Sequence, residues 1–348
     1  MKSPDSNLRH YTKGGQSAAR EPACGVDAGA KPAGPEALHF IVPGDYAGLR
    51  LDQALVKLFP DYSRNRLQEW ITLSRVKVDG RVATSKQKVW GGEKLEVSPQ
   101  IHPAEQPYLA EDIALDIVYE DDALMVINKP AGLVVHPGSG NWEGTLLNAL
   151  LHHAPQLQQV PRAGIVHRLD KDTSGLLVVA KTLQAQTALV RQLEARSVQR
   201  EYLALVHGEL ARPGRVDAPI GRHPSQRVKM AVVENGKTAV THYRIEQSFP
   251  SCTLLRCRLE TGRTHQIRVH MARIGHPLVG DRVYLKGPQK CVPKLRALLG
   301  GFPRQALHAT RLALQHPVNG GWMEWHAPLP QDMLNLLRQI KAIVHEPA

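Results

Sequence analysis

The chain has 348 residues, of which 42% are hydrophobic and 22% charged, a balance typical of a globular protein with room for two domains. Its formal net charge of +12 favours a polyanionic partner, most simply nucleic acid, over a merely soluble basic protein. No apolar run approaches the roughly 20 residues of a membrane helix, and the N-terminus lacks the apolar core of a secretory signal.

The cysteines indicate a reducing compartment. Cys24, Cys252, Cys257 and Cys291 form no CxxC pair and no metal-ligand spacing with histidine. Cys252 and Cys257 are five residues apart, so on one strand they would point to opposite faces. We therefore expect reduced thiols in a cytoplasmic protein, with no disulfide and no metal.

Residues 1–37 hold five Gly, four Pro, seven Ala and three Ser but hardly any large apolar side chain. Such a segment cannot bury enough surface to offset its ordering entropy, so we expect a disordered extension.

Two short helices and a hairpin are predicted between residues 48 and 97. Apolar residues at helical spacing mark the first helix, which ends at Pro60, and Ser63 can cap the second. The stretch "RVKVDGRVAT" alternates around an Asp-Gly pair, which is a hairpin signal. Ten Lys/Arg stand against six Asp/Glu in this region, and this cluster favours phosphate contacts over a simple solvated face.

Residues 98–112 are rich in Pro and polar side chains and are typical of an interdomain linker. From residue 113 to 348, strands and helices alternate without regular βαβ winding. Strands are expected within residues 115–130, 175–181, 201–210, 239–247 and 252–262, and helices within 144–153, 183–196 and 330–344. This order predicts an α+β fold with a mixed, largely antiparallel sheet.

The stretch "HRLDKDTSGLLVVAK", residues 167–181, concentrates charge just before an apolar strand. In extended chain Asp170 and Asp172 would project to the same side, while Leu169 anchors the loop in the core. Asp170 is a candidate nucleophile, general acid or base, or metal ligand, although the residue type alone favours an ordinary turn, because Asp forms hydrogen bonds with its own backbone there. No cluster of carboxylates suited to zinc or magnesium lies nearby in the sequence, which argues against a metal.

A second polar group lies in "LETGRTHQIRVHMARIGHP", residues 259–277. Thr264 can cap a helix with an apolar stripe, and His265 and Arg268 would then share a different face of it. Arg268 either faces water or reaches inward and holds Asp170 ionised.

Three further stretches are ambiguous from the residues alone. The Pro and Gly of "NKPAGLVVHPGSG", from residue 128, can punctuate the chain or shape a ligand site. Tyr202, on a predicted strand, can be a core aromatic or a catalytic group. Residues 284–303 form a basic, insertion-like loop that can contact RNA or simply be mobile.

The 48–97 region, with "RLDQAL", "SRNRLQEWI" and "VKVDG", resembles a small α/β S4 RNA-binding domain. That resemblance implies that Arg64, Arg66, Arg75 and Lys77 lie near the RNA backbone.

Over residues 48–343, "INKPAGLVVHPG", "HRLDKDTSG", "REYLALV" and "TGRTHQIRVHM" resemble the RNA pseudouridine synthases related to the bacterial ribosomal large-subunit enzymes. The resemblance implies that Asp170 is the essential carboxylate, with Asp172 a turn residue, and that Arg268 pairs with Asp170. It also implies that Tyr202 stacks on the target base and that Arg168 fills the space left by a flipped nucleotide.

The function implied by this resemblance is isomerisation of uridine to pseudouridine in large-subunit (23S) rRNA, in the stem-loop near the intersubunit bridge, supporting ribosome assembly. It implies no cofactor, a large-subunit rRNA or pre-ribosomal partner, and no membrane, and a monomer is the default expectation. A non-catalytic RNA-binding assembly factor, or the same isomerase acting on another rRNA or tRNA site, is the alternative.

Overall fold

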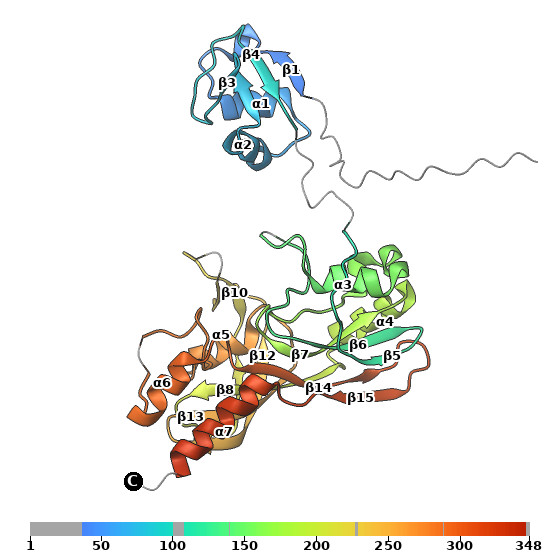
Figure 1. Ribbon diagram of the computed structural model, residues 1–348, viewed down its shortest axis with the longest axis vertical. Coiled ribbons are helices and arrows are strands. Elements are labelled where there is room, and N and C mark those ends of the chain that lie inside the picture. The colour runs from blue at the N-terminus through green and yellow to red at the C-terminus, as the bar shows by residue number, and fades with distance from the viewer. Residues whose placement is uncertain (1–36, 100–107, 139, 227–228, 288, 346–348) are drawn as a thin grey trace, which may run out of the picture. The chain divides into compact units, whose positions relative to one another are not determined.

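The computed structural model describes residues 37–99, 108–138, 140–226, 229–287 and 289–345 (Figure 1). The chain forms two compact units, which divide between His102 and Pro103. The predicted extension, residues 1–37, lies outside the described residues except for residue 37, and so does most of the predicted linker at 98–112.

The first unit has the two predicted helices and the predicted hairpin. Helices α1 (Leu51–Leu58) and α2 (Arg64–Thr72) pack on an antiparallel sheet with the strand order β1-β4-β2-β3. Its strands are β1 (Leu38–Ile41), β2 (Val76–Val78), β3 (Arg81–Val82) and β4 (Lys94–Val97), and a 3-10 turn, η1, spans Gly44–Tyr46. Ser63 caps α2 by accepting the amide of Arg66 at 3.4 Å. Strand β1 precedes residue 48, so the sheet begins before the predicted boundary of this region.

The second unit is built on a sheet that has nine strands among the described residues, in the order β5-β6-β7-β14-β8-β13-β12-β9, with β15 also paired to β14. Within that part of the chain only β7 and β14 pair in parallel, so the sheet is mixed and largely antiparallel, as predicted. The strands are β5 (Ile117–Glu120), β6 (Leu124–Lys129), β7 (Ser174–Ala180), β8 (Gln199–His207), β9 (Gly214–Asp217), β12 (Val240–Phe249), β13 (Cys252–Leu259), β14 (Leu307–Gln315) and β15 (Trp322–His326); β10 (Ile220–Arg222) and β11 (Met230–Val232) form a separate pair.

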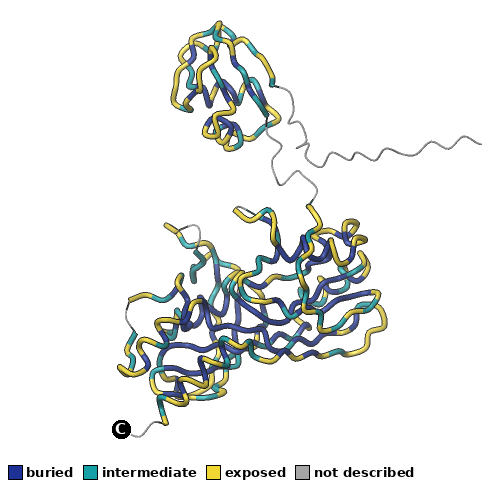
Figure 2. The backbone as a smooth tube through the Cα atoms, in the orientation of Figure 1, coloured by how far each residue is buried: buried dark blue, intermediate teal, exposed yellow. Residues whose placement is uncertain are grey.

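Helices cover both faces of this sheet, and buried residues follow its central strands (Figure 2). One face packs against α3 (Leu146–His153) and α5 (Gln266–Arg273), beside the 3-10 turns η3 (Pro155–Gln159) and η4 (Pro161–Gly164). The other packs against α4 (Leu183–Glu194), α6 (Pro293–Gly301) and α7 (Gln331–His345). Strand β7 sends Leu177 to the first face and Leu176 to the second, which explains its uninterrupted apolar sequence.

The basic stretch 284–303 was predicted as a loop, but it contains α6, whose Leu295 and Leu299 are buried in the core.

The two cysteines of β13 lie as their spacing predicted. Cys252 and Cys257 are buried free thiols in clusters on opposite faces of the sheet. None of the helices that the structure describes combines the length and apolar character needed to cross a membrane.

Candidate active site

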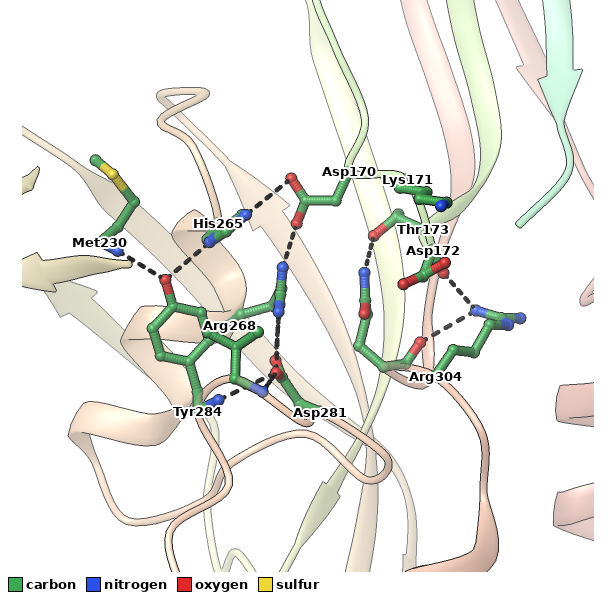
Figure 3. A network of polar contacts seen from close by, with 12 residues as sticks. Asp170, Lys171, Asp172, Thr173, Met230, His265, Arg268, Asp281, Tyr284 and Arg304 are labelled. Atoms are coloured by element: carbon green, nitrogen blue, oxygen red, sulfur yellow. Dashed lines mark hydrogen bonds and ion pairs between the residues drawn. The ribbon is translucent and has the colours of Figure 1, made fainter. Parts of the chain in front are cut away.

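Asp170 lies on a tight turn immediately before β7. The amide of Thr173 donates to the carbonyl of Asp170 at 3.1 Å, so this backbone is turned rather than extended. The expectation that Asp170 and Asp172 project to one side is therefore wrong. Figure 3 shows the Asp170 carboxylate pointing toward His265 and Arg268, whereas Asp172 lies on the side of Arg304. Leu169, 4% exposed, anchors the turn in the core as predicted.

Two buried cations hold the backbone of this turn. Lys129 is fully buried, and its ammonium donates at 2.7–2.9 Å to the carbonyl oxygens of Pro130, Leu133 and Lys171. Burial lowers the pKa of Lys129 to about 7. On the other side, Nη1 of Arg304 donates to the carbonyl of Asp172 at 3.1 Å, while Nε and Nη2 bind Asp332 on α7 at 2.6 and 2.9 Å. The turn that carries Asp170 is thus tied both to β6 and to the C-terminal helix.

Arg268 reaches inward from α5 to Asp170. Its Nη1 donates to Oδ2 of Asp170 at 2.9 Å, and its Nε and Nη2 donate to the fully buried Asp281 at 2.7 and 2.9 Å. Burial opposes the charge of Arg268, but these two carboxylates outweigh it and raise the pKa of Arg268 above its ordinary value. Of the two sequence alternatives, the structure therefore selects the inward one: the guanidinium is 5% exposed and permanently charged.

His265 approaches Asp170 from the start of α5. The predicted cap by Thr264 is wrong: His265 itself is the residue before the helix, with a left-handed φ of 58° and no side-chain cap. This backbone conformation turns the imidazole back, so that Nε2 lies 3.8 Å from the Asp170 carboxylate and Nδ1 lies 2.8 Å from the Tyr284 hydroxyl (Figure 3). Burial lowers the pKa of His265, so a neutral ring is favoured beside Asp170.

Asp170 opens into a cavity of about 1210 Å³ that also exposes parts of Tyr202, His265 and Arg268. Tyr202 on β8 is 6% exposed, belongs to the core cluster and lines this cavity at the same time. The two interpretations of this residue are therefore compatible: a packed aromatic presents part of its ring to a cavity. Burial raises the pKa of Tyr202, so its phenol is protonated at neutral pH.

The cavity wall is rich in cationic side chains. Arg168 is exposed and lies at this wall, next to the turn of Asp170. Other cationic residues that line the cavity are Arg162, Lys171, Arg196, Arg200, Arg263, Arg282 and Arg304. The carboxylates that line it are fewer, namely Asp170, Asp172, Glu194 and Glu260. The cavity therefore suits an anionic ligand large enough to span its wall.

Sequence reasoning missed several residues that build the site. Asp281, Tyr284, Lys129, Arg200 and Arg304 were not singled out, although each is buried and lines or supports the cavity. Asp281 and Tyr284 lie in the segment "GDRVY", which follows α5. No pattern in the neighbouring sequence indicates that the Asp281 carboxylate is buried or that it pairs with an arginine. Only the fold brings Asp281 to Arg268.

In the first unit, three of the four basic residues expected near RNA already have contacts. Arg64 bonds the buried Asp52 at 2.7 Å, and Lys77 bonds Glu96 at 2.9 Å. The Arg66 guanidinium lies 4.9 Å from the Tyr62 ring centroid and 5.4 Å from that of Trp70. Arg75 is exposed. Arg64 and Lys77 are therefore paired with carboxylates, whereas Arg66 lies against the aromatic rings of Tyr62 and Trp70, which carry no charge.

Comparison with known proteins identifies the class of molecule to which this fold and site belong. Residues 123–273 match the RNA pseudouridylate synthase family, and residues 49–95 match the S4 domain. The matched segment contains Asp170, Tyr202 and Arg268. The chain belongs to the RNA pseudouridylate synthases, enzymes that isomerise uridine, and carries an S4 domain ahead of the synthase domain.

Three curated relatives share one name, ribosomal large subunit pseudouridine synthase D. The protein of Nitrosomonas europaea is 59% identical over 308 residues, which cover 88% of this chain and 89% of the relative. Those of Yersinia pestis and Escherichia coli K12 are 57% and 56% identical over 303 residues, covering 86% of this chain and 93% of each relative. Among solved structures, human RNA pseudouridylate synthase domain containing 4 is 28% identical with a TM-score of 0.52, covering 65% of this chain and 92% of that one.

Proposed function

We propose that this pseudouridine synthase acts on large-subunit ribosomal RNA, in the stem-loop near the intersubunit bridge, and that its modification supports ribosome assembly. The shared name of its relatives supports the ribosomal substrate. The S4 match and the net charge of +12 support an RNA partner. The observation that carries the assignment of the reacting group is the ion pair between Asp170 and Arg268 at the cavity.

In the proposed reaction, the N1–C1′ bond breaks, the uracil rotates, and a C5–C1′ bond forms; the proton on C5 is then lost and N1 gains a proton, so the product is an isomer of uridine. Nothing is oxidised or reduced and no external group is transferred, so the chemistry itself requires no cofactor. The Asp170 carboxylate either attacks C1′ or takes a ribose proton to give a glycal-like intermediate. Arg268, itself fixed by Asp281, donates to that carboxylate and orients it at the cavity.

Tyr202 is proposed to hold the detached base. Its ring lines the cavity, and its protonated phenol favours stacking and hydrogen bonding over abstraction of the C5 proton. The target nucleotide must leave the helical stack before C1′ can be reached. Arg168, exposed at the cavity wall, is suited to occupy the space that the flipped nucleotide leaves.

The proposed partner is large-subunit rRNA, free or in a pre-ribosomal particle, and the proposed location is the cytoplasm, where that RNA is processed in bacteria. We propose a monomer as the acting form. Arg64, Arg66, Arg75 and Lys77 are proposed to contact RNA phosphates, since they share one basic region of the S4 domain.

The test is pseudouridine mapping of total rRNA, by carbodiimide adduct and primer extension, in cells with and without this gene. We expect signals in one large-subunit stem-loop to vanish without the gene and to return with the wild-type protein but not with Asp170→Asn. An unchanged large-subunit map would overturn the ribosomal target and favour another rRNA or a tRNA. Normal assembly with Asp170→Asn, alongside lost pseudouridine, would support a separate binding role.

A further inference from the structure

Arg200 is a second buried arginine of the cavity, and the proposed chemistry does not use it. It lies on β8 two residues before Tyr202, so both side chains emerge on the same face of the sheet. It is 7% exposed and lines the cavity with Tyr202. Its Nε is buried without a hydrogen-bond partner.

Arg268, a buried arginine of the cavity described above, has the ionic partners that Arg200 lacks among the described residues. The two arginines are equally buried, at 5% and 7% exposed, but Arg268 is bonded to two carboxylates. A buried guanidinium nitrogen without a hydrogen-bond partner has lost its contact with water, and no carboxylate in the described part of the chain is bonded to Arg200 to offset that loss. Such a group is expected where a ligand supplies the missing anion.

Two of the four acidic residues that line the cavity, Asp170 and Glu260, are paired with other side chains, and no contact joins Asp172 or Glu194 to Arg200 within the described residues. Asp170 is bonded to Arg268, and Glu260 accepts from His242 and lies 3.6 Å from Arg196. His167, near Arg200, is also unsuited as an acceptor: its Nε2 already accepts the amide of Val178 at 3.2 Å. Burial, reinforced by the charge of Arg200, lowers the pKa of His167 to about 3, so its ring is neutral and Nδ1 carries the proton.

Gly262, in the segment between β13 and α5, leaves room for the guanidinium. A Cβ at this position would lie 2.6 Å from Nη1 of Arg200. Gly262 is itself exposed, so Arg200 lies under the surface at the cavity wall rather than deep in the core. Any side chain at residue 262 would displace Arg200 from this place.

We propose that Arg200 is a phosphate-binding residue of the site, and that its guanidinium receives the nonbridging oxygens of the RNA phosphodiester next to the flipped uridine. This rests on the proposed function for the identity of the RNA. A phosphodiester fits because its paired anionic oxygens match the fork of a guanidinium, whereas a uracil carbonyl brings no charge to replace the missing counter-ion. Arg200 is thus a binding residue on the wall, while Asp170 remains the reacting group.

The experiment compares Arg200→Met and Arg200→Lys with wild type by equilibrium binding to an unmodified large-subunit rRNA fragment at several salt concentrations. Removal of one phosphate contact should reduce the slope of log K against log salt by about 0.9 in Arg200→Met and weaken binding roughly tenfold. Arg200→Lys should keep most of the slope. Arg212→Met is the matched control, because Arg212 is exposed and does not line the cavity.

A second measurement identifies the phosphate directly. Once the target uridine is mapped, fragments carrying a single neutral methylphosphonate linkage on either side of it are bound by wild type and by Arg200→Met. One linkage should weaken wild type as much as the substitution does, and should add nothing to the variant. Additive losses at both linkages, or an unchanged salt slope, would overturn the proposal.

Stability distinguishes binding from a structural role. Because Arg200→Met removes an unpaired buried charge, its thermal midpoint should equal or exceed that of wild type. A large drop in the thermal midpoint with an unchanged salt slope would show that Arg200 has a structural role and would overturn the proposal. Binding needs no turnover, so failure of wild type to form pseudouridine would refute the proposed function while the role of Arg200 is still measured.

Discussion

Asp281 binds two of the three nitrogens of the Arg268 guanidinium, at 2.7 and 2.9 Å, and leaves Nη1 to reach Asp170 at 2.9 Å. The arginine is thereby fixed in the one direction that aims it at the turn before β7. Asp281 also accepts the amides of Val283 and Tyr284, at 2.9 and 3.1 Å, so its own position is set by backbone. Asp281 is a positioning residue for a carboxylate that it does not touch.

Asp281→Asn should lower both activity and stability. It removes the charge that holds Arg268, so we expect turnover to fall roughly 100-fold through misplacement of Asp170. Breaking the buried pair should cost about 3 kcal/mol in the free energy of unfolding, measured by denaturant titration. Asp217→Asn is the control, because its ion pair with Arg215 is half exposed. Equal losses in both variants would contradict this account.

Asp170→Asn should abolish turnover while leaving RNA affinity nearly unchanged. The amide can still accept a hydrogen bond from Arg268, so the turn is preserved, but it cannot act as an anionic nucleophile or base. Single-turnover assays and equilibrium binding on the same rRNA fragment separate the two effects. Measurable turnover would refute the assignment of Asp170 as the reacting group.

Asp332→Asn tests whether the C-terminal helix supports the active site. Asp332 on α7 holds the guanidinium of Arg304, which in turn donates to the carbonyl of Asp172. We expect kcat to fall roughly tenfold with KM almost unchanged, because the turn loosens while the RNA-binding side chains stay in place. Gln331→Glu on the same helix should have no effect. A change in KM alone would argue for an RNA contact instead.

Stability should decrease between pH 6.5 and pH 4 because of His308. Burial lowers its pKa to about 4, and it lies 2.9 Å from the Ser174 hydroxyl at the β7–β14 junction. In this window the unfolded chain binds a proton that the folded protein does not, so stability is complete above pH 6.5 and is lost as the pH falls. At pH 5 the loss from His308 should be about 2 kcal/mol relative to pH 7. His167, whose pKa burial also lowers, contributes to the loss in the same window, so His308→Gln should lose about 2 kcal/mol less than wild type over this pH change. The exposed His326→Gln should lose as much as wild type, and equal behaviour of the two variants would be evidence against His308.

Deleting residues 1–102, which contain the compact S4 unit, should weaken RNA binding and flatten its salt dependence. Each phosphate that the protein no longer neutralises reduces the slope of log K against log salt by about 0.9. The remaining unit has its own core and should keep its thermal transition. Arg75→Ala in the full chain is the finer test of the exposed arginine. An unchanged slope after deletion would show that the S4 unit lies outside the RNA-binding surface.

The sequence predicted helices and strands correctly where the buried residues recur at the regular spacing of a helix or form one continuous apolar run. The helices α1 and α2 follow from apolar spacing and the Ser63 cap, and β7 follows from its continuous apolar run, because a strand covered on both faces has no polar side. The sequence did not predict local structure correctly where contacts with distant residues determine the backbone conformation. The left-handed φ of His265 and the helix inside residues 284–303 depend on tertiary contacts with Tyr284 and with the core.

The amino-acid sequence by itself determined the α+β class, the basic RNA-facing character and the motif around Asp170, because these reside in composition and in neighbouring residues. The tertiary structure alone decided that Arg268 turns inward, that Asp281 fixes it, and that Arg200 is buried without a partner. Each of these depends on residues far apart in the chain, such as Asp170 and Arg268, which are 98 positions apart. Whether a charged side chain is buried, and which partner it has, depends on residues that only the tertiary fold brings next to it.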